Sequence, residues 1–209
     1  DFSGKSTQAM LLVEKLKQDH HIVHFIREPG GTAISEKIRD ILLDKKHLEM
    51  GNTAEIFLFS ASRSQLVTQV IKPALTRNEV VVCDRYCDST TAYQGYGRGL
   101  NLDDVLAINR IATTGTMPHL TVFVDIPIDE IERRKNRAGL SFDRMESAGR
   151  AFYERVRNGY HQLAIAEPER WFTVDGLLSV EEIEKLVWLD VEKRLKNTTS
   201  KAATLTAGC

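Results

Sequence analysis

The stretch Ser3-Gly4-Lys5-Ser6-Thr7 stands near the start of the chain and fits the second half of a phosphate-binding loop, G-x-x-x-x-G-K-[ST]. In such a loop, backbone N–H groups at the start of a helix point at phosphate oxygens, and the helix dipole adds positive potential. Gly4 would let the backbone approach closely. Lys5 would reach the β- and γ-phosphates, and the Ser6 hydroxyl would face a Mg²⁺ ion. An amphipathic helix is expected to follow over residues 8–16.

The phosphate loop is incomplete in this sequence. Its first glycine would lie one position before Asp1, after a buried strand, and the 209 residues contain neither. Gly-Lys-Ser alone also fits an ordinary helix N-terminus with a polar start. The motif by itself therefore leaves both interpretations open, and the rest of the chain must decide between them.

Length, charge and cysteine content restrict the class of protein. A chain of 209 residues is long enough for one domain with a sizeable core. Its net charge of −1 gives no basic field to attract a nucleic-acid duplex or an anionic membrane, and no apolar run is long enough to span a bilayer. The three cysteines form neither a disulfide framework nor a zinc site. We therefore expect a cytoplasmic protein without nucleic-acid or membrane partners.

Short apolar runs alternate with helical patterns along the chain. Strands are predicted at 22–26, 80–83, 120–124 and 171–174. Helices are predicted at 8–16, from 32 or 35 to 42, 53–71, 102–112, from 129, at 148–166 and at 180–195. Strands separated by helices imply right-handed crossovers, so the prediction is an α/β fold whose parallel sheet is flanked by helices.

Three segments are assigned from their composition. The segment 85–100 is predicted to be a loop because it holds Gly95, Gly97 and Gly99. The long helix is expected to stop before Pro73, because the residue that precedes a proline disfavours helical backbone. Residues 196–209 lack an apolar period and are predicted to be a disordered tail after a single domain over 1–195.

Charged residues follow four of the predicted strands, where ligands bind in parallel α/β sheets. They are Arg27-Glu28, Asp84-Arg85, Asp125 and Asp175. An acidic residue at the place of Asp84 holds Mg²⁺ in phosphate-loop enzymes; the alternative is an aspartate that caps the next turn. The adjoining Arg85 favours the first interpretation, because a guanidinium binds phosphate oxygens with two parallel hydrogen bonds.

Several segments together resemble the thymidylate kinases. Residues 84–95 resemble D-R-Y-x-x-S-x-x-A-Y-Q-G, residues 27–32 resemble R-E-P-G-G-T of the bacterial type, and residues 59–63 resemble F-x-A-x-R. Ile71-Lys72-Pro73-Ala74-Leu75 and the end of the phosphate loop, D-x-x-G-K-S-T, match as well. The resemblance extends from Asp1 to about Leu195 and implies a P-loop kinase fold with a mobile lid at about 133–147. The family's first, central strand and the first glycine of its loop are outside this sequence.

The resemblance implies ATP-dependent transfer of a phosphoryl group to thymidine 5′-monophosphate (dTMP), giving the diphosphate (dTDP). It assigns ATP binding to Ser3, Gly4, Lys5, Ser6 and Thr7, and Mg²⁺ binding to Ser6 and Asp84. It assigns substrate binding to Asp1, Glu28, Arg39, Phe59, Arg63, Arg85, Ser89, Thr90 and Tyr93.

The resemblance also implies what the substrate-binding residues contact. Phe59 would stack on thymine, Arg63 would donate to a thymine carbonyl, and Ser89 and Thr90 would face the base edge. Tyr93 would pack below the sugar and favour deoxyribose, Asp1 would accept from the 3′-hydroxyl, and Arg85, with Arg39, would hold the phosphate. Without the resemblance, Phe59 fits a core position and Arg63 fits a solvated helix face. Arg39 fits a surface pair with Ser35 or Glu36, about one helical turn away.

The basic patch at 132–137 resembles the lid of this family. A closing segment rich in arginine can place a guanidinium on the transferred group and exclude water. One type of the family has its basic residue in the phosphate loop and the other has it in the lid. Phe2 and Ser3 offer no cation, so the resemblance implies the lid type, with Arg133 and Arg137 as catalytic contacts and Arg144 closing the lid. The alternative is an ordinary basic helix end, which the helix dipole favours.

The family resemblance further implies a homodimer, for which apolar residues around Ile56 and Val67 would supply a face. Two other functions stay open. One is another nucleoside or nucleotide kinase of the same fold. The second is an inactive, N-terminally truncated fragment, because loss of a central strand leaves unpaired edges and an unfilled core. We expect instead that the natural chain carries additional N-terminal residues.

Overall fold

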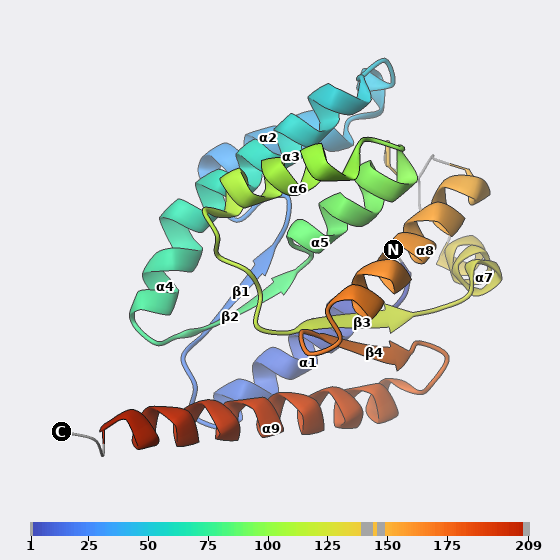
Figure 1. Cartoon of the computed structure of the whole chain (residues 1–209). Helices are drawn as coiled ribbons and strands as arrows, with labels where there is room; N and C mark the ends of the chain where they lie inside the picture. Colours follow the sequence, from blue (N-terminus) through green and yellow to red (C-terminus); the bar gives the residue numbers. More distant parts are fainter. Residues whose placement is uncertain (1, 139–143, 146–148, 207–209) are drawn as a thin grey trace.

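The computed structural model describes residues 2–138, 144–145 and 149–206, in which helices and parallel strands alternate along the chain (Figure 1). The strands are β1 (Val23–Arg27), β2 (Val80–Asp84), β3 (Thr121–Asp125) and β4 (Trp171–Asp175). The α-helices are α1 (Lys5–Gln18), α2 (Ala33–Leu43), α3 (Asn52–Leu66), α4 (Lys72–Thr76), α5 (Cys87–Thr90), α6 (Leu102–Thr113), α7 (Ile128–Ala138), α8 (Arg150–Ala166) and α9 (Val180–Thr206). A 3₁₀ turn, η1 (Lys45–His47), and two π-helical segments, η2 (Val67–Ile71) and η3 (Thr91–Gly97), complete these elements.

The strands form two parallel pairs, which in the described part of the chain are separate sheets. β1 pairs with β2 so that Arg27 lies opposite Asp84, and β3 pairs with β4 so that Asp125 lies opposite Asp175. The N–H of Glu28 donates to the carbonyl of Asp84 at 3.1 Å and continues the first pairing past the strand end. Within each pair the charged strand ends therefore lie together, as predicted.

Helices cover the strands on two sides, with α1 and α9 on one and α2, α3 and α6 on the other (Figure 1). Successive side chains of a strand point to opposite faces. Val80 and Val82 accordingly pack with the cluster that contains Leu16 of α1 and Val187 of α9. Val81 and Cys83 belong to the opposite cluster, which includes Leu66 of α3 and Ile71 of η2. No helix within the described residues is both long and apolar enough to cross a membrane.

The helix predicted to stop before Pro73 continues past it. α3 leads through the wide turn η2 into α4, and Pro73 lies in the first turn of α4. Proline removes one N–H donor from the helix, and the π-helical segment η2 directly before it marks where the helical hydrogen-bond pattern changes.

The predicted loop at 85–100 is wrong, because α5 and η3 make most of this segment helical. Two of its glycines provide space rather than flexibility. A Cβ atom at Gly97 would lie 2.7 Å from Phe152 of α8, and one at Gly95 would lie 2.8 Å from Leu102 of α6. Glycine in this segment therefore allows neighbouring helices to pack closely on η3.

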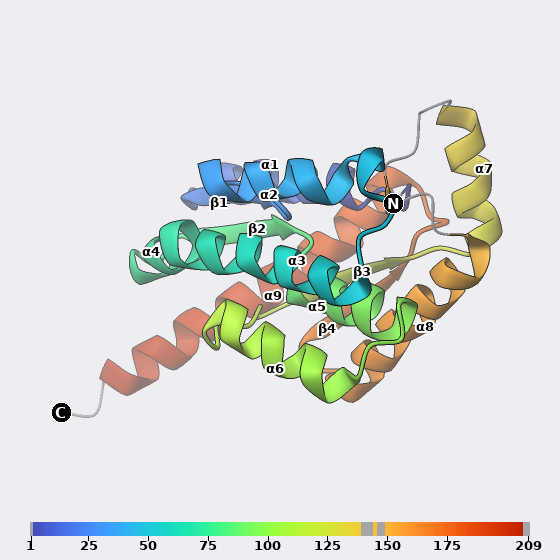
Figure 2. The same ribbon diagram turned by 90° about the horizontal axis from the view of Figure 1, so that it is seen from above.

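The last helix is longer than predicted. α9 continues beyond Leu195 to Thr206, whereas the sequence predicted a disordered tail from residue 196. Residues 196–206 contain neither glycine nor proline, so nothing in them ends a helix, and an ion pair of 3.0 Å between Lys196 and Glu192 spans the predicted boundary. Figure 2 shows that α9 ends on the side of the molecule opposite α7.

Candidate active site

The phosphate loop meets the end of β2. Gly4 caps α1 with a left-handed backbone (φ 90°), which glycine adopts without a Cβ clash. α1 begins at Lys5, so Ser6 and Thr7 lie in its first turn. The Ser6 hydroxyl donates to Oδ2 of Asp84. The two residues predicted to hold a metal are therefore in contact.

The chemistry of this contact suits Mg²⁺. Hydroxyl and carboxylate oxygens are the ligands that Mg²⁺ prefers. The second carboxylate oxygen of Asp84, Oδ1, is buried and has no hydrogen-bond partner among the described residues. A buried carboxylate oxygen without a partner is costly, and a bound cation would satisfy it.

A pocket opens directly beside this contact, starting with Arg85, the residue after Asp84. Its lining consists of Glu28, Pro29, Arg39, Leu43, Phe59, Arg63, Arg85, Tyr86, Ser89, Thr90, Tyr93, Gln94 and Met145. The structure thus brings together the substrate-binding residues predicted from the sequence, apart from Asp1, which lies outside the described residues. It adds Pro29, Leu43, Tyr86, Gln94 and Met145, which the sequence reasoning missed.

Arg85 is held by two aromatic residues. Its backbone is left-handed (φ 72°), a conformation uncommon outside glycine. Its guanidinium carbon lies 4.9 Å from the ring centroid of Tyr93, and Nη2 donates to the Tyr93 hydroxyl at 3.1 Å. Burial raises the pKa of Tyr93 to about 12, so this hydroxyl stays neutral. Nη1 also lies 3.5 Å from the hydroxyl of Tyr160.

Tyr160 of α8 is a site residue for which the sequence reasoning had no role. Its hydroxyl donates to Oγ of Ser89 at 2.9 Å, and its ring stacks on Phe123 with centroids 5.1 Å apart. Tyr160 lies 71 residues from Ser89 in the chain. No local pattern signals such a contact.

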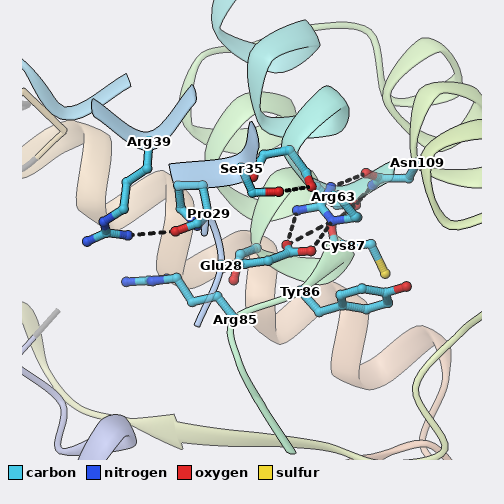
Figure 3. A network of polar contacts seen from close by, with 12 residues as sticks. Glu28, Pro29, Ser35, Arg39, Arg63, Arg85, Tyr86, Cys87 and Asn109 are labelled. Atoms are coloured by element: carbon cyan, nitrogen blue, oxygen red, sulfur yellow. Dashed lines mark hydrogen bonds and ion pairs between the residues drawn. The ribbon is translucent and has the colours of Figure 1, made fainter. Parts of the chain in front are cut away.

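Arg63 is buried, with a side chain only 2% exposed, so the solvated helix face proposed as an alternative is wrong. Its Nε and Nη2 donate to Oε2 of Glu28 at 2.9 and 2.7 Å (Figure 3). Burial raises the pKa of Glu28, although the charge and hydrogen bonds of Arg63 act in the opposite direction. Phe59 and Arg63 are four residues apart on α3, so they lie on one face of the helix.

Arg39 of α2 also turns toward the pocket. Its Nη1 donates to the carbonyl of Pro29 at 2.9 Å (Figure 3). Glu36 bonds instead to the N–H of Gly31 at 2.7 Å. The structure therefore favours the pocket position of Arg39 over the surface pair.

The predicted lid arginines lie apart from the pocket lining. Arg133 and Arg137 are exposed on α7, and Arg133 pairs with Glu130 at 2.6 Å. Their catalytic role stays a prediction, and residues 139–143 and 146–148 of the predicted lid lie outside the described residues. A different arginine of α7, Arg134, donates to the carbonyls of Phe2 at 3.3 Å and Gly176 at 2.9 Å.

Arg144, which was predicted to close the lid, is buried. It pairs with Glu55 of α3 at 2.6 Å, and its Nε donates to the carbonyl of Leu42 at 2.7 Å. These contacts tie Arg144 to α2 and α3. The predicted role of Arg144 in closing the lid stays a prediction.

Comparison with known proteins identifies the family of the chain. The family model described as thymidylate kinase matches residues 1–187. The chain is 46% identical over 187 residues to a thymidylate kinase of Kosmotoga olearia, which covers 90% of this chain and 89% of the relative. It is 45% identical over 195 residues to a thymidylate kinase of Chlorobaculum parvum, and this alignment covers 90% of this chain and 89% of the relative.

The fold agrees as well. The chain is similar to the crystal structure of thymidylate kinase from Ehrlichia chaffeensis, with a TM-score of 0.73, 30% identity, and 94% of this chain and 93% of that chain covered. A family model that spans most of the sequence, relatives of this identity and a shared fold lead to one conclusion. The chain belongs to the thymidylate kinase family.

Proposed function

We propose that the chain carries out the reaction of its family, the conversion of dTMP to dTDP, with ATP as the phosphoryl donor. The observation that carries this proposal is the direct succession of Asp84 and Arg85. Asp84 contacts Ser6 of the phosphate loop, and Arg85 lines the pocket. Donor and acceptor phosphates would thus meet at adjacent residues of one strand end.

The phosphate loop beside Asp84 and the pocket beside Arg85 would have distinct tasks. Lys5 and the N–H groups of the loop from Ser3 to Thr7 would hold the ATP phosphates.

Arg85 and Arg39 would hold the dTMP phosphate. Phe59, Arg63, Ser89 and Thr90 would enclose the base, and Tyr93 would lie under the sugar. Asp1 is kept as the acceptor for the 3′-hydroxyl. The buried carboxylate of Glu28 would orient the guanidinium of Arg63, which would bind the base.

Phosphoryl transfer requires position and charge stabilisation more than covalent chemistry from the protein. The dTMP phosphate is already an adequate nucleophile, so no general base is required. Arg85 would align the attacking oxygen with the donor. Arg133 and Arg137 would stabilise the charge that develops on the transferred group.

Mg²⁺ would be held by Ser6 and Asp84. It supplies charge neutralisation between the donor phosphates when it is bound. Oδ1 of Asp84, which has no hydrogen-bond partner within the described part of the chain, supports this assignment.

A homodimer and a cytoplasmic location complete the proposal, and both rest on the family resemblance. Ile56 and Val67, which the sequence reasoning placed on a dimer face, are 1% and 0% exposed, so they pack inside the chain. Exposed apolar side chains on α2 and α6 offer a face instead: Ile34, Ile41, Leu106 and Ile111.

A coupled assay of ADP release with ATP, Mg²⁺ and a panel of nucleoside monophosphates tests this function. We expect turnover that depends on dTMP and is much slower with the other acceptors. Lys5→Met should lower kcat by about a thousandfold, as expected for loss of charge stabilisation at a transferring phosphate, while dTMP affinity measured by calorimetry stays unchanged. A folded protein that prefers another acceptor would replace dTMP in the proposal, and near-normal turnover of the Lys5→Met variant would remove Lys5 from it.

A further inference from the structure

Asn109 of α6 lies behind the base pocket and is 5% exposed. Its side-chain oxygen accepts from Nη1 of Arg63 at 3.1 Å (Figure 3). Its Nδ2 donates to the carbonyl of Cys87 at 3.1 Å and to Oγ1 of Thr91 at 3.0 Å. With both hydrogens of the amide directed at acceptors, only the oxygen can face the arginine.

The donors of Arg63 divide between protein and pocket. A guanidinium has five N–H donors in a rigid plane. Glu28 takes one from Nε and one from Nη2, and Asn109 takes one from Nη1. Two donors remain beyond these contacts within the described part of the chain, and Arg63 lines the pocket. The direction of these two N–H donors depends on the tilt of the guanidinium plane.

Glu28 and Asn109 hold the plane at different nitrogens. Glu28 bonds along the Nε–Nη2 edge, and Asn109 bonds at Nη1. A plane held along one edge can pivot about it, whereas a plane held at a third nitrogen cannot. Asn109 also reaches Cys87 and Thr91, next to Ser89 and Thr90 on α5. Asn109 therefore fixes the guanidinium of Arg63 relative to α5, whose residues Ser89 and Thr90 line another part of the pocket.

We propose that Asn109 is a positioning residue for base selection, which acts by aiming the remaining donors of Arg63 at a carbonyl of the pyrimidine. Thymine carries an acceptor oxygen at the position where cytosine carries an amino donor. A fixed donor attracts the first and repels the second. This inference rests on the proposed function, because it assumes that dTMP occupies the pocket.

Isothermal calorimetry with dTMP and dCMP, together with steady-state kinetics, tests the role of Asn109. Asn109→Leu keeps the size of the side chain and removes all three bonds. We expect it to raise the Kd and KM for dTMP about tenfold or more and to lower the preference for dTMP over dCMP about tenfold, as expected for a misplaced hydrogen bond from a charged donor. Because Asn109 touches no reacting atom, kcat should stay within about twofold.

Thr91→Val is the matched control. It removes the bond from Asn109 to Thr91 but leaves the bond to Arg63, so the preference for dTMP should stay within about threefold of the unchanged protein. Circular dichroism checks that both variants fold. If the leucine variant does not fold, Asn109→Ser takes its place with the same expectation, because a serine hydroxyl is too short to reach Arg63.

Three outcomes overturn this inference. An unchanged preference in a folded Asn109 variant shows that Arg63 needs no second support. An equal loss in Thr91→Val shows that Asn109 acts only on the packing of α5 and η3. If the unchanged protein does not bind dTMP, the proposed function fails and this inference fails with it; binding of dTMP with an unchanged preference in the variant removes only the role of Asn109.

Discussion

The carboxylate of Asp88 and the guanidinium of Arg170 form an ion pair with two hydrogen bonds, Nη1 to Oδ2 at 2.7 Å and Nη2 to Oδ1 at 2.9 Å. Thr121 at the start of β3 donates to the same carboxylate at 2.7 Å. The side chain of Arg170 is only 12% exposed and that of Asp88 only 10%. Because Asp88 precedes Ser89 and Thr90, this pair fastens the turn that carries two pocket hydroxyls to the β3–β4 sheet.

Replacing Asp88 should weaken the fold. Asp88→Asn leaves Arg170 without its most buried anionic partner, and we expect the free energy of unfolding to fall by about 3 kcal/mol. Urea denaturation measures the change. Asp103→Asn, at an exposed position in the first turn of α6, is the control, with an expected change within about 0.5 kcal/mol. Equal effects of the two variants would show that the ion pair contributes little.

Arg85→Lys should separate phosphate binding from base binding. Lysine keeps the charge but cannot form the planar fork that holds a phosphate and contacts two tyrosine hydroxyls. We expect kcat/KM for dTMP to fall about 100-fold. Binding of thymidine, which lacks the phosphate, should change by less than about threefold in calorimetry. A comparable loss for thymidine would mean that Arg85 shapes the whole pocket.

Phe59→Ala should raise the requirement for dTMP. Loss of an aromatic face against the base removes about 1.5 to 3 kcal/mol, which corresponds to an increase in KM of about 10- to 100-fold. The KM for ATP should not change, because Phe59 lines the pocket that we propose for dTMP. Phe57→Ala on the same helix is the control, since Phe57 is 56% exposed. An unchanged dTMP requirement in Phe59→Ala would remove Phe59 from the base site.

Glu55 should make stability depend on acid pH. It is 1% exposed and pairs with Arg98 at 3.1 Å and Arg144 at 2.6 Å. Burial raises its pKa, but hydrogen bonds from Arg98 and Gln94 and the charges of both arginines outweigh this, so the pKa lies below the ordinary value. A carboxyl with a depressed folded pKa stabilises the fold above its unfolded pKa, and this contribution is lost as the pH falls through the folded value.

Urea denaturation between pH 7 and pH 3 measures this contribution. Glu55→Gln should be less stable than the unchanged protein by about 3 kcal/mol at pH 7, because two arginines lose their buried counter-charge. The gap should narrow as the pH falls below about 4.3, the ordinary pKa of a glutamate. A gap that stays constant with pH would show that Glu55 acts through packing alone.

The sequence predicted the strands and their charged ends for the same physical reason. Buried parallel strands are short apolar runs, which the sequence shows directly. The residues that follow β1 and β2 must meet at the carboxyl edge of the sheet. Glu28 and Arg85 could therefore be predicted from the strand pattern and the motifs together. Pattern alone did not place Phe59 and Arg63, which share an ordinary helix face; the family resemblance did.

What the sequence could not show depends on packing between distant segments. Asn109 reaches Arg63 across 46 residues, and Tyr160 reaches Ser89 across 71. Such contacts leave no local signal. Gly97 gave a misleading signal, because glycine marks a flexible loop and a site of close helix packing equally well; only the position of Phe152 tells them apart.

The left-handed backbone at Arg85 has a consequence for attempts to make this enzyme resist heat. An L-residue in this conformation gives up about 1 kcal/mol relative to glycine. His20 (φ 64°) and Thr114 (φ 49°), at the ends of α1 and α6, share the conformation, and glycine there is a natural thermostabilising substitution. At position 85 the same substitution would remove a guanidinium that lines the pocket and that we propose holds the dTMP phosphate. Thermal resistance and the proposed role of Arg85 therefore conflict at this position, where the chain retains the less stable residue.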